Sequence, residues 1–245
     1  MERKIYAVID TETCGGAAQE YCPTYDFAVK AFDSAFNYVD EMRILILPNM
    51  RLSSTFYGKK KKDFYLNALK NENVVIAFSE EEALKMVEEW LTINGVDCIC
   101  AFNSAFDFER TFISEIASDY EFIDLFLAFA QTIGAYKKYQ NFCYENGYLT
   151  KKYKRPRMTA EICYRYLTNN TDFVESHTAM EDVDIESIIL KAILDSHRKF
   201  SRNAKFPQKI CANAGIFPNS FHLLVRFLAA WEVPLLCQSC IRRRL

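Results

Sequence analysis

The stretch SEEEALKMVEEWLTINGVDCICAFNSAFDFERTFISEI, residues 79–116, decides the fold class of this chain. Its first half carries apolar residues at helical spacing behind a capping-box sequence at 79–82, and Asn94-Gly95 is a typical helix end. A wholly apolar run over 98–102 then predicts a buried strand, and helical spacing returns over 106–116. Strands that alternate with helices pair in parallel, so this stretch predicts an α/β sandwich.

The same reading extends to both sides of this stretch. Upstream, three extended runs over 5–9, 27–32 and 42–47 can pair as a meander. Downstream, helices dominate, and we expect them over about 124–146, 159–167 and 178–197. The pattern weakens beyond residue 198. The chain is therefore expected to contain one α/β domain over 1–198 and a C-terminal extension of unknown role over 199–245.

Composition excludes several classes of protein. Half of the 245 residues are hydrophobic and a quarter are charged, which rules out a disordered polymer or a collagen-like repeat. The formal net charge is −2, whereas a protein that binds nucleic acid over its whole surface would be clearly basic. Any contact with nucleic acid must therefore be local or assisted by bound cations.

Cysteine usage and apolar patterning favour a reduced environment. The chain has nine cysteines, an odd number, and several lie inside apolar runs, where a free thiol behaves as a small hydrophobic group. The N-terminus has too short an apolar run for a signal peptide, and the most apolar C-terminal stretch, 217–236, contains charged residues. We expect a soluble, cytoplasmic protein without a membrane partner.

Four carboxylates occupy unusual places in this pattern. Asp10 and Glu12 follow the first strand on one side of it, and Asp107 follows the strand over 98–102 at the start of a helix. Asp182 lies on the apolar stripe of the last helix, whose start resembles a capping box over 178–181, and His177 lies five residues before it. Each signal alone is weak, because an acid near a turn or a helix N-terminus is common.

Together these residues predict one chemistry. A cluster of carboxylates suits a hard cation such as Mg²⁺ or Mn²⁺, and two such ions can stabilise the attacking and leaving oxygens of a phosphodiester. A histidine that titrates near neutrality is a suitable general base for the attacking water. The residues therefore indicate metal-assisted phosphodiester hydrolysis.

The order of these motifs resembles that of the DEDDh 3′–5′ exonucleases, within the DnaQ-like, ribonuclease H-like superfamily. The segments 7–15, with Asp10 and Glu12, and 102–107, with Asp107, are similar to the first two family motifs, and His177 followed by Asp182 is similar to the third. The resemblance covers roughly residues 1–195. It implies a ribonuclease H-like exonuclease fold with a mixed five-stranded sheet flanked by helices.

The resemblance also implies roles for individual residues. Two divalent metal ions, Mg²⁺ or Mn²⁺, would be bound by the four carboxylates, and His177 would be the general base. The pocket for the 3′-terminal nucleotide would be lined by Thr11, Thr13, Asn103 and Phe106. Two positions depart from the family pattern: Phe102 stands where many relatives have histidine, and Cys14 precedes Gly15 where the motif often has threonine. Neither position is a metal ligand.

Two further groups of residues stand apart from these motifs. The four lysines of 59–62 are either a solvated face or a contact for backbone phosphate, and the segment 151–157, which mixes basic residues with Tyr153, is the better candidate for the second role. Cys237 and Cys240 have the spacing of a zinc pair, with Cys211 and His222 as candidate partners, although one pair is a weak signal.

The leading interpretation is a 3′–5′ exonuclease that releases nucleoside 5′-monophosphates from single-stranded or frayed 3′ ends, with DNA favoured over RNA. One alternative is an enzyme that trims RNA or degrades oligoribonucleotides. Another is a proofreading subunit that is tethered to a polymerase by the C-terminal extension. The alternative from a different class is a catalytically silent nucleic-acid-binding scaffold on the same fold, which would be expected to lack one of the acids or the histidine.

Overall fold

The computed structural model describes residues 4–14, 19–52, 59–71, 73–116 and 119–200, which belong to one compact unit of the chain. The predicted C-terminal extension lies outside the described residues beyond Phe200, and so does the candidate zinc group of Cys211, His222, Cys237 and Cys240. The side chains of Lys59, Lys60 and Lys62 also lie outside them.

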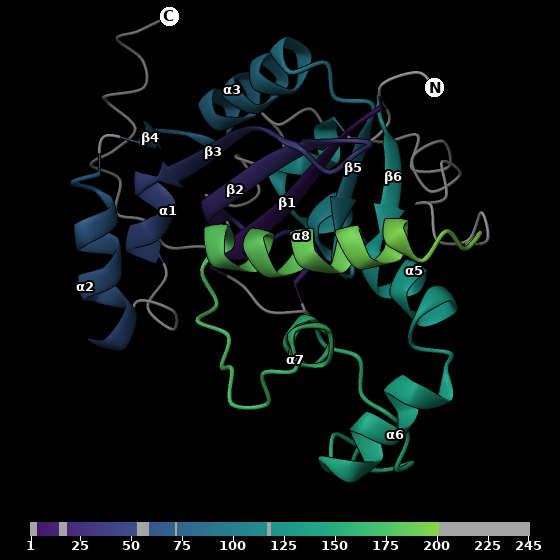
Figure 1. The fold of residues 1–245 in the computed structure, drawn as a ribbon. Helices are drawn as coiled ribbons and strands as arrows, with labels where there is room; N and C mark the ends of the chain where they lie inside the picture. Colours follow the sequence, from purple (N-terminus) through teal and green to yellow (C-terminus); the bar gives the residue numbers. More distant parts are fainter. Residues whose placement is uncertain (1–3, 15–18, 53–58, 72, 117–118, 201–245) are drawn as a thin grey trace, which may run out of the picture. The chain divides into compact units, whose positions relative to one another are not determined.

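A six-stranded mixed sheet forms the centre of the fold (Figure 1). Its strand order is β4-β3-β2-β1-β5-β6, and only the β1–β2 and β2–β3 pairs are antiparallel among the described strands. The strands are β1 (Ile5–Thr13), β2 (Thr24–Asp33), β3 (Tyr38–Ile46), β4 (Val74–Ala77), β5 (Cys98–Ala101) and β6 (Glu121–Asp124).

The five-stranded sheet that the family resemblance implies is wrong by one strand, because the described residues form six. The antiparallel meander over β1, β2 and β3 is confirmed, and so is the parallel pairing of β5 with β1. The sequence pattern predicts neither β4 nor β6 as a strand. Both lie at the edges of the sheet and have only four residues.

Alternation along β1 divides the interior into two hydrophobic layers. Ile5, Ala7 and Ile9 face one layer and Val8 faces the other. The first layer is covered by α3 (Glu80–Ile93), by α4 (Ala105–Arg110) and by the 3₁₀ helix Phe112–Glu115. The second is covered by α5 (Leu125–Thr132), α6 (Lys137–Glu145), α7 (Ala160–Thr168) and α8 (Ala179–Asp195), and α8 crosses the strands in Figure 1.

A smaller cluster of buried residues lies where the meander ends. Tyr25 and Leu45 from the sheet pack there with Met50 of α1 (Leu47–Leu52) and Tyr65 of α2 (Lys59–Ala68). The rings of Tyr25 and Tyr65 meet edge to face, with their centroids 5.5 Å apart. This packing places α2 beside the end of β1, where Glu12 lies.

Most of the expected helices are present, and two of them are interrupted. Helix α3 begins at its predicted cap, because the Ser79 side chain accepts a hydrogen bond from the backbone N–H of Glu82. The helix expected over 124–146 is broken into α5 and α6 around Gly134, where an added Cβ would lie 2.8 Å from the sulfur of Met158. The helix expected over 106–116 is interrupted at Thr111, which is in an extended conformation.

The described cysteines form no disulfide bonds. The six described cysteines, of which five are buried, are free thiols: Cys14, Cys22, Cys98, Cys100, Cys143 and Cys163. Burial raises the pKa of the Cys163 thiol to about 12, so this group is an inert part of the core. Within the described ranges, every helix is too short or too polar to cross a bilayer.

Candidate functional site

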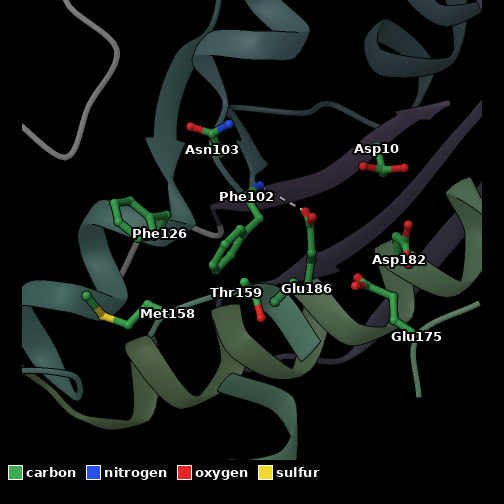
Figure 2. Close-up of a pocket in the computed structure, with 10 residues that line it drawn as sticks. Asp10, Phe102, Asn103, Phe126, Met158, Thr159, Glu175, Asp182 and Glu186 are labelled. Atoms are coloured by element: carbon green, nitrogen blue, oxygen red, sulfur yellow. Dashed lines mark hydrogen bonds between the residues drawn. The ribbon is translucent and has the colours of Figure 1, made fainter. Parts of the chain in front are cut away.

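Three carboxylates from distant parts of the sequence meet at the end of β1. Asp10 and Glu12 extend from the same side of this strand, and Asp182 extends toward them from the first turn of α8. One carboxylate oxygen from each lies within 4.8 Å of the others. Figure 2 shows Asp10 and Asp182 facing each other across the site. The structure therefore brings together three of the four acids that the sequence singled out.

The start of α8 is fixed by a buried carboxylate of β2. Asp26 accepts a hydrogen bond from the backbone N–H of Ala179 at 3.3 Å, and Thr178 makes no side-chain capping bond. The capping box expected over 178–181 is therefore not formed, although the helix begins where it was predicted. Asp182 lies three residues after Ala179, in the first turn of α8. The hydrogen bond from Ala179 to Asp26 therefore helps to position this acid beside the end of β1.

Asp26 is the centre of a buried hydrogen-bond network. Arg43 donates to its two oxygens from Nε and Nη2, at 2.9 and 2.7 Å, and the Tyr65 hydroxyl donates to Oδ2 at 2.9 Å. The neighbouring Tyr25 hydroxyl donates to Glu12 Oε2 at 3.3 Å. Asp26 is fully buried and needs these donors, because an isolated buried carboxylate is costly. The network ties β2, β3, α2 and α8 together behind the acids.

Burial and mutual repulsion make the three acids hard to ionise together. Burial, followed by the charge of Glu175, raises the pKa of Asp182 to about 9. Burial raises the pKa of Glu12 to about 7, against the opposing effect of Lys61, whose Nζ lies 3.9 Å from Glu12 Oε1. The pKa of Asp10 is raised well above its usual range by burial and then by the charges of neighbouring acids.

The donor set fits a hard divalent cation. Oδ1 of Asp182 is buried and has no hydrogen-bond partner among the residues that the structure describes. A buried acceptor of this kind requires a donor or a cation. A carboxylate oxygen of Asp182 lies within 4.8 Å of oxygens of Asp10 and Glu12. Carboxylate oxygens are the preferred ligands of Mg²⁺ and Mn²⁺. Asp10, Glu12 and Asp182 are therefore the described residues best placed to hold a metal ion.

Asp107 lies next to this group of carboxylates. Among the described residues, its oxygens are not part of the set of ligand atoms that lie within 4.8 Å of one another. Its Oδ1 accepts a hydrogen bond of 2.5 Å from the Thr11 hydroxyl, on the opposite side of β1 from Asp10. Its charge still contributes to the raised pKa of Asp10. Burial raises the pKa of Asp107 itself to about 7. The fourth acid is thus adjacent to the cluster and is held by a neighbour of Asp10.

His177 lies at the rim of the site, immediately before α8. Its side chain is 63% exposed, and its Nδ1 lies 3.6 Å from Oε2 of Glu175. His177, Glu175 and Asp182 form a second group whose ligand atoms lie within 4.8 Å of one another. The backbone of His177 is left-handed, with φ of 57°, and its carbonyl accepts a hydrogen bond from Lys61 Nζ. This arrangement leaves the imidazole open to solvent beside the acids.

A cavity of about 410 Å³ opens beside the carboxylates. Figure 2 shows its two walls: acidic side chains on one side, and Phe102, Phe126 and Met158 on the other. The size is within the usual range for a small-molecule or nucleotide pocket. The lining residues are Asp10, Phe102, Asn103, Phe126, Met158, Thr159, Ala160, Glu175, Asp182 and Glu186.

Only one of the four residues that the family resemblance assigns to a terminal-nucleotide pocket lines this cavity. Asn103 does so, with a left-handed φ of 60°. Thr11 and Thr13 are buried, and Phe106 is half-buried with Arg110 over its ring. None of these three lines the cavity, so their contact with a nucleotide remains a prediction.

The sequence reading missed two acids of the cavity. Glu186 is 3% exposed and its Oε2 accepts a hydrogen bond of 3.0 Å from the backbone N–H of Phe102. It lies one helical turn after Asp182, so the i, i+4 spacing on a buried face was a signal that could have identified it. Glu175 precedes α8 and lies outside any periodic segment. No pattern in the sequence indicated that it would face Asp182.

Neither the protein-family models nor the curated proteins give a significant match to this sequence. Solved structures do. A full-length 3′-exonuclease is 12% identical over 83% of this chain and 90% of its own, with a TM-score of 0.51. A 3′-exonuclease described in 3′-end-specific recognition of a histone mRNA stem-loop is 10% identical over 79% of this chain and 82% of its own, with a TM-score of 0.53. At these identities the likeness shows the fold, so the predicted ribonuclease H-like α/β architecture is confirmed.

Proposed function

We propose that this protein is a metal-dependent 3′–5′ exonuclease that removes nucleoside 5′-monophosphates from single-stranded or frayed 3′ ends. One observation carries the proposal: the carboxylates of Asp10, Glu12 and Asp182 converge within 4.8 Å beside a cavity large enough for one nucleotide. The similarity in fold to solved 3′-exonucleases supports it. Since the fold itself hosts many activities, the argument depends on the site.

The metal site would be formed by the acids at the end of β1. We assign Asp10, Glu12 and Asp182 as ligands, and Asp107, held by Thr11, as the fourth acid of the site. Divalent ions bound there would neutralise the charge that develops on the scissile phosphate and would make the attacking water more acidic. The hydrogen bond from Tyr25 and the anchoring of α8 by Asp26 would hold the ligands in place.

His177 is the residue we assign to accept the proton of the attacking water. Its Nδ1 faces Glu175, so Nε2 is the nitrogen assigned to take that proton. The water oxygen forms a bond to the phosphorus of the terminal nucleotide, and the bond from this phosphorus to the 3′-oxygen of the preceding nucleotide breaks. That oxygen takes a proton from solvent water and becomes the new 3′-hydroxyl. The Glu175 carboxylate stabilises the imidazolium that results.

The cavity explains why such an enzyme would act at chain ends. Phe102, Phe126 and Met158 form an apolar wall on which the terminal base can pack, while the sugar and phosphate would lie toward the acids. Asn103 and Thr159 supply polar groups beside this wall. We expect DNA to be preferred over RNA, and we treat RNA trimming as the alternative that the experiment must distinguish.

The test uses the full chain with 5′-labelled 20-nucleotide DNA and RNA strands of one sequence, with Mn²⁺, with Mg²⁺ or with EDTA. We expect stepwise shortening from the 3′ end with either metal, none with EDTA, and faster shortening of DNA. Asp10→Ala should bind the strands without shortening them. Faster shortening of RNA would support the exoribonuclease alternative. Binding by the unchanged protein without any cleavage would support a silent scaffold and overturn the proposal.

A further inference from the structure

A short hairpin over residues 148–157, here called the basic hairpin, connects α6 to α7. It is closed by a bridge between Leu149 and Pro156 and by the backbone hydrogen bonds Thr150 N–H to Arg155 O and Arg157 N–H to Tyr148 O, of 2.8 and 2.9 Å. Thr150 Oγ1 accepts a further bond from the N–H of Arg155. These bonds give the hairpin a defined shape, so its side chains project from a fixed position.

The base of the basic hairpin is joined to the wall of the cavity. The carbonyl of Arg157 accepts a hydrogen bond of 2.6 Å from the hydroxyl of Tyr139, a fully buried residue of α6. The next residues along the chain, Met158 and Thr159, line the cavity beside Phe102, as Figure 2 shows. A strand whose last nucleotide occupies the cavity therefore has this hairpin as a near neighbour.

The basic hairpin carries a concentrated positive charge. Five of the seven residues over 151–157 are cationic, and all five are exposed: Lys151, Lys152, Lys154, Arg155 and Arg157. In the described ranges none of them forms an ion pair with a carboxylate. The whole chain has a formal charge of −2, so this local excess is opposite in sign to the protein as a whole. This concentration of positive charge makes the basic hairpin a suitable surface for binding a polyanion.

An exposed aromatic ring lies among these charges. Tyr153 is 63% exposed, with Lys152 Nζ 5.0 Å and Arg155 Cζ 5.5 Å from its ring centroid. Binding of an acidic protein or an anionic membrane would need only the positive charges and would not need the aromatic ring. An unpaired base can also stack on the ring, while the adjacent cations contact the phosphates on either side of it. The combination therefore favours a single-stranded nucleic acid.

We infer that the basic hairpin binds the single strand upstream of the nucleotide in the cavity, with Tyr153 stacking on a base and Lys152, Lys154 and Arg155 contacting phosphates. This inference rests on the proposed function for the direction of the strand. It adds a surface outside the metal site. It implies that long strands are held more tightly than short ones and that the difference depends on salt.

Binding is measured with a 5′-fluorescein 12-nucleotide DNA strand in EDTA, between 50 and 200 mM NaCl, by anisotropy. The hairpin variant combines Lys152→Ala, Lys154→Ala and Arg155→Ala. We expect it to bind at least about tenfold more weakly at 100 mM NaCl, and to lower the slope of log Kd against log salt by about 2, since each phosphate contact on a single strand contributes about 0.7. Tyr153→Ala should weaken binding without changing this slope, and Tyr153→Phe should restore it.

The matched control removes the same charge elsewhere. Lys70, Lys85 and Lys191 are exposed and lie on other parts of the domain, so their combined replacement by alanine should leave binding within about twofold of the unchanged protein. An equal loss in both triple variants would show an effect of net charge alone and overturn the inference. So would unchanged binding by the hairpin variant, or a Tyr153→Ala variant that binds as tightly as the original.

Hydrolysis separates this inference from the proposed function. With Mn²⁺, the ratio of kcat/KM for the 12-nucleotide strand to that for a dinucleotide should fall at least about tenfold in the hairpin variant. If the unchanged protein hydrolyses no strand while the hairpin variant still loses binding, the proposed function fails and the basic hairpin stands. If strands are hydrolysed and this ratio does not change, the inference fails and the proposed function stands.

Discussion

At the scale of single residues, Asp182 should limit the stability of the metal-free protein. Its carboxylate is buried among acids that raise its pKa to about 9, so at pH 8 the folded state carries the cost of repulsion or of protonation. We expect Asp182→Asn to raise the free energy of unfolding in EDTA by about 1–2 kcal/mol, or about 3–6 °C in Tm. The same change should lower turnover at least about 10²-fold, since a metal ligand is lost.

A matched control for this substitution lies two residues further along the same helix. Asp184 is 55% exposed and pairs with Lys30, so Asp184→Asn removes the same charge without touching the acid cluster. It should change stability by less than about 1 kcal/mol and leave turnover as it is. If Asp182→Asn destabilised the metal-free protein as well, the strained cluster described above would be wrong. Calorimetry and the strand-shortening assay give the two measurements.

His177 provides the second prediction at this scale. We expect His177→Ala to lower kcat about 10²–10⁴-fold with little change in Tm, because its imidazole is exposed and its loss removes only the proposed base. His197 is a matched control, since it too is exposed and has a left-handed φ, of 51°. His197→Ala should retain full activity. Equal rates for both variants in single-turnover assays would remove His177 from the mechanism.

At the scale of secondary-structure elements, the buried pair of Asp26 and Arg43 should fix the position of α8. Asp26→Asn leaves the Arg43 guanidinium buried without its counter-charge, which typically costs about 3–5 kcal/mol. We expect a loss of this size in urea unfolding. The double variant Asp26→Asn, Arg43→Met should recover much of it, because no buried charge is then left unpaired. A double variant as unstable as the single one would contradict this account.

The elements also show what the sequence could predict. The long helices α3 and α8 could be predicted, because their apolar residues recur at helical spacing. Each of the three motifs could be recognised as well, because it lies within one short segment of the sequence. The edge strands β4 and β6 and the break at Gly134 were not predicted, since the packing of distant parts of the chain decides them. The acids Asp10 and Asp182 were predicted as site residues, and the structure brings them together. Glu175 could not be found, because only the folded path of the chain before α8 turns its side chain toward Asp182.

At the scale of the whole molecule, the acid cluster should make stability depend on pH and on metal together. The carboxyl pKa values of Glu12, Asp107 and Asp182 are raised to about 7, 7 and 9. Between about pH 4 and pH 9 the folded state therefore binds more protons than the unfolded chain, whose carboxyls titrate near pH 4. By linkage, stability falls as the pH rises through this window.

In EDTA we therefore expect the Tm to decrease from pH 5.5 to pH 8.5, and the decrease to be smaller for Asp182→Asn. Mn²⁺ at 1 mM should raise the Tm at pH 8.5 by several degrees and much less at pH 5.5, because protons compete with the cation for the same oxygens. Scanning calorimetry at the two pH values, with and without metal, measures all four states. A Tm gain from Mn²⁺ that was equal at both pH values would place the metal away from these carboxylates, since only ligands that titrate within the window make binding depend on pH in this way.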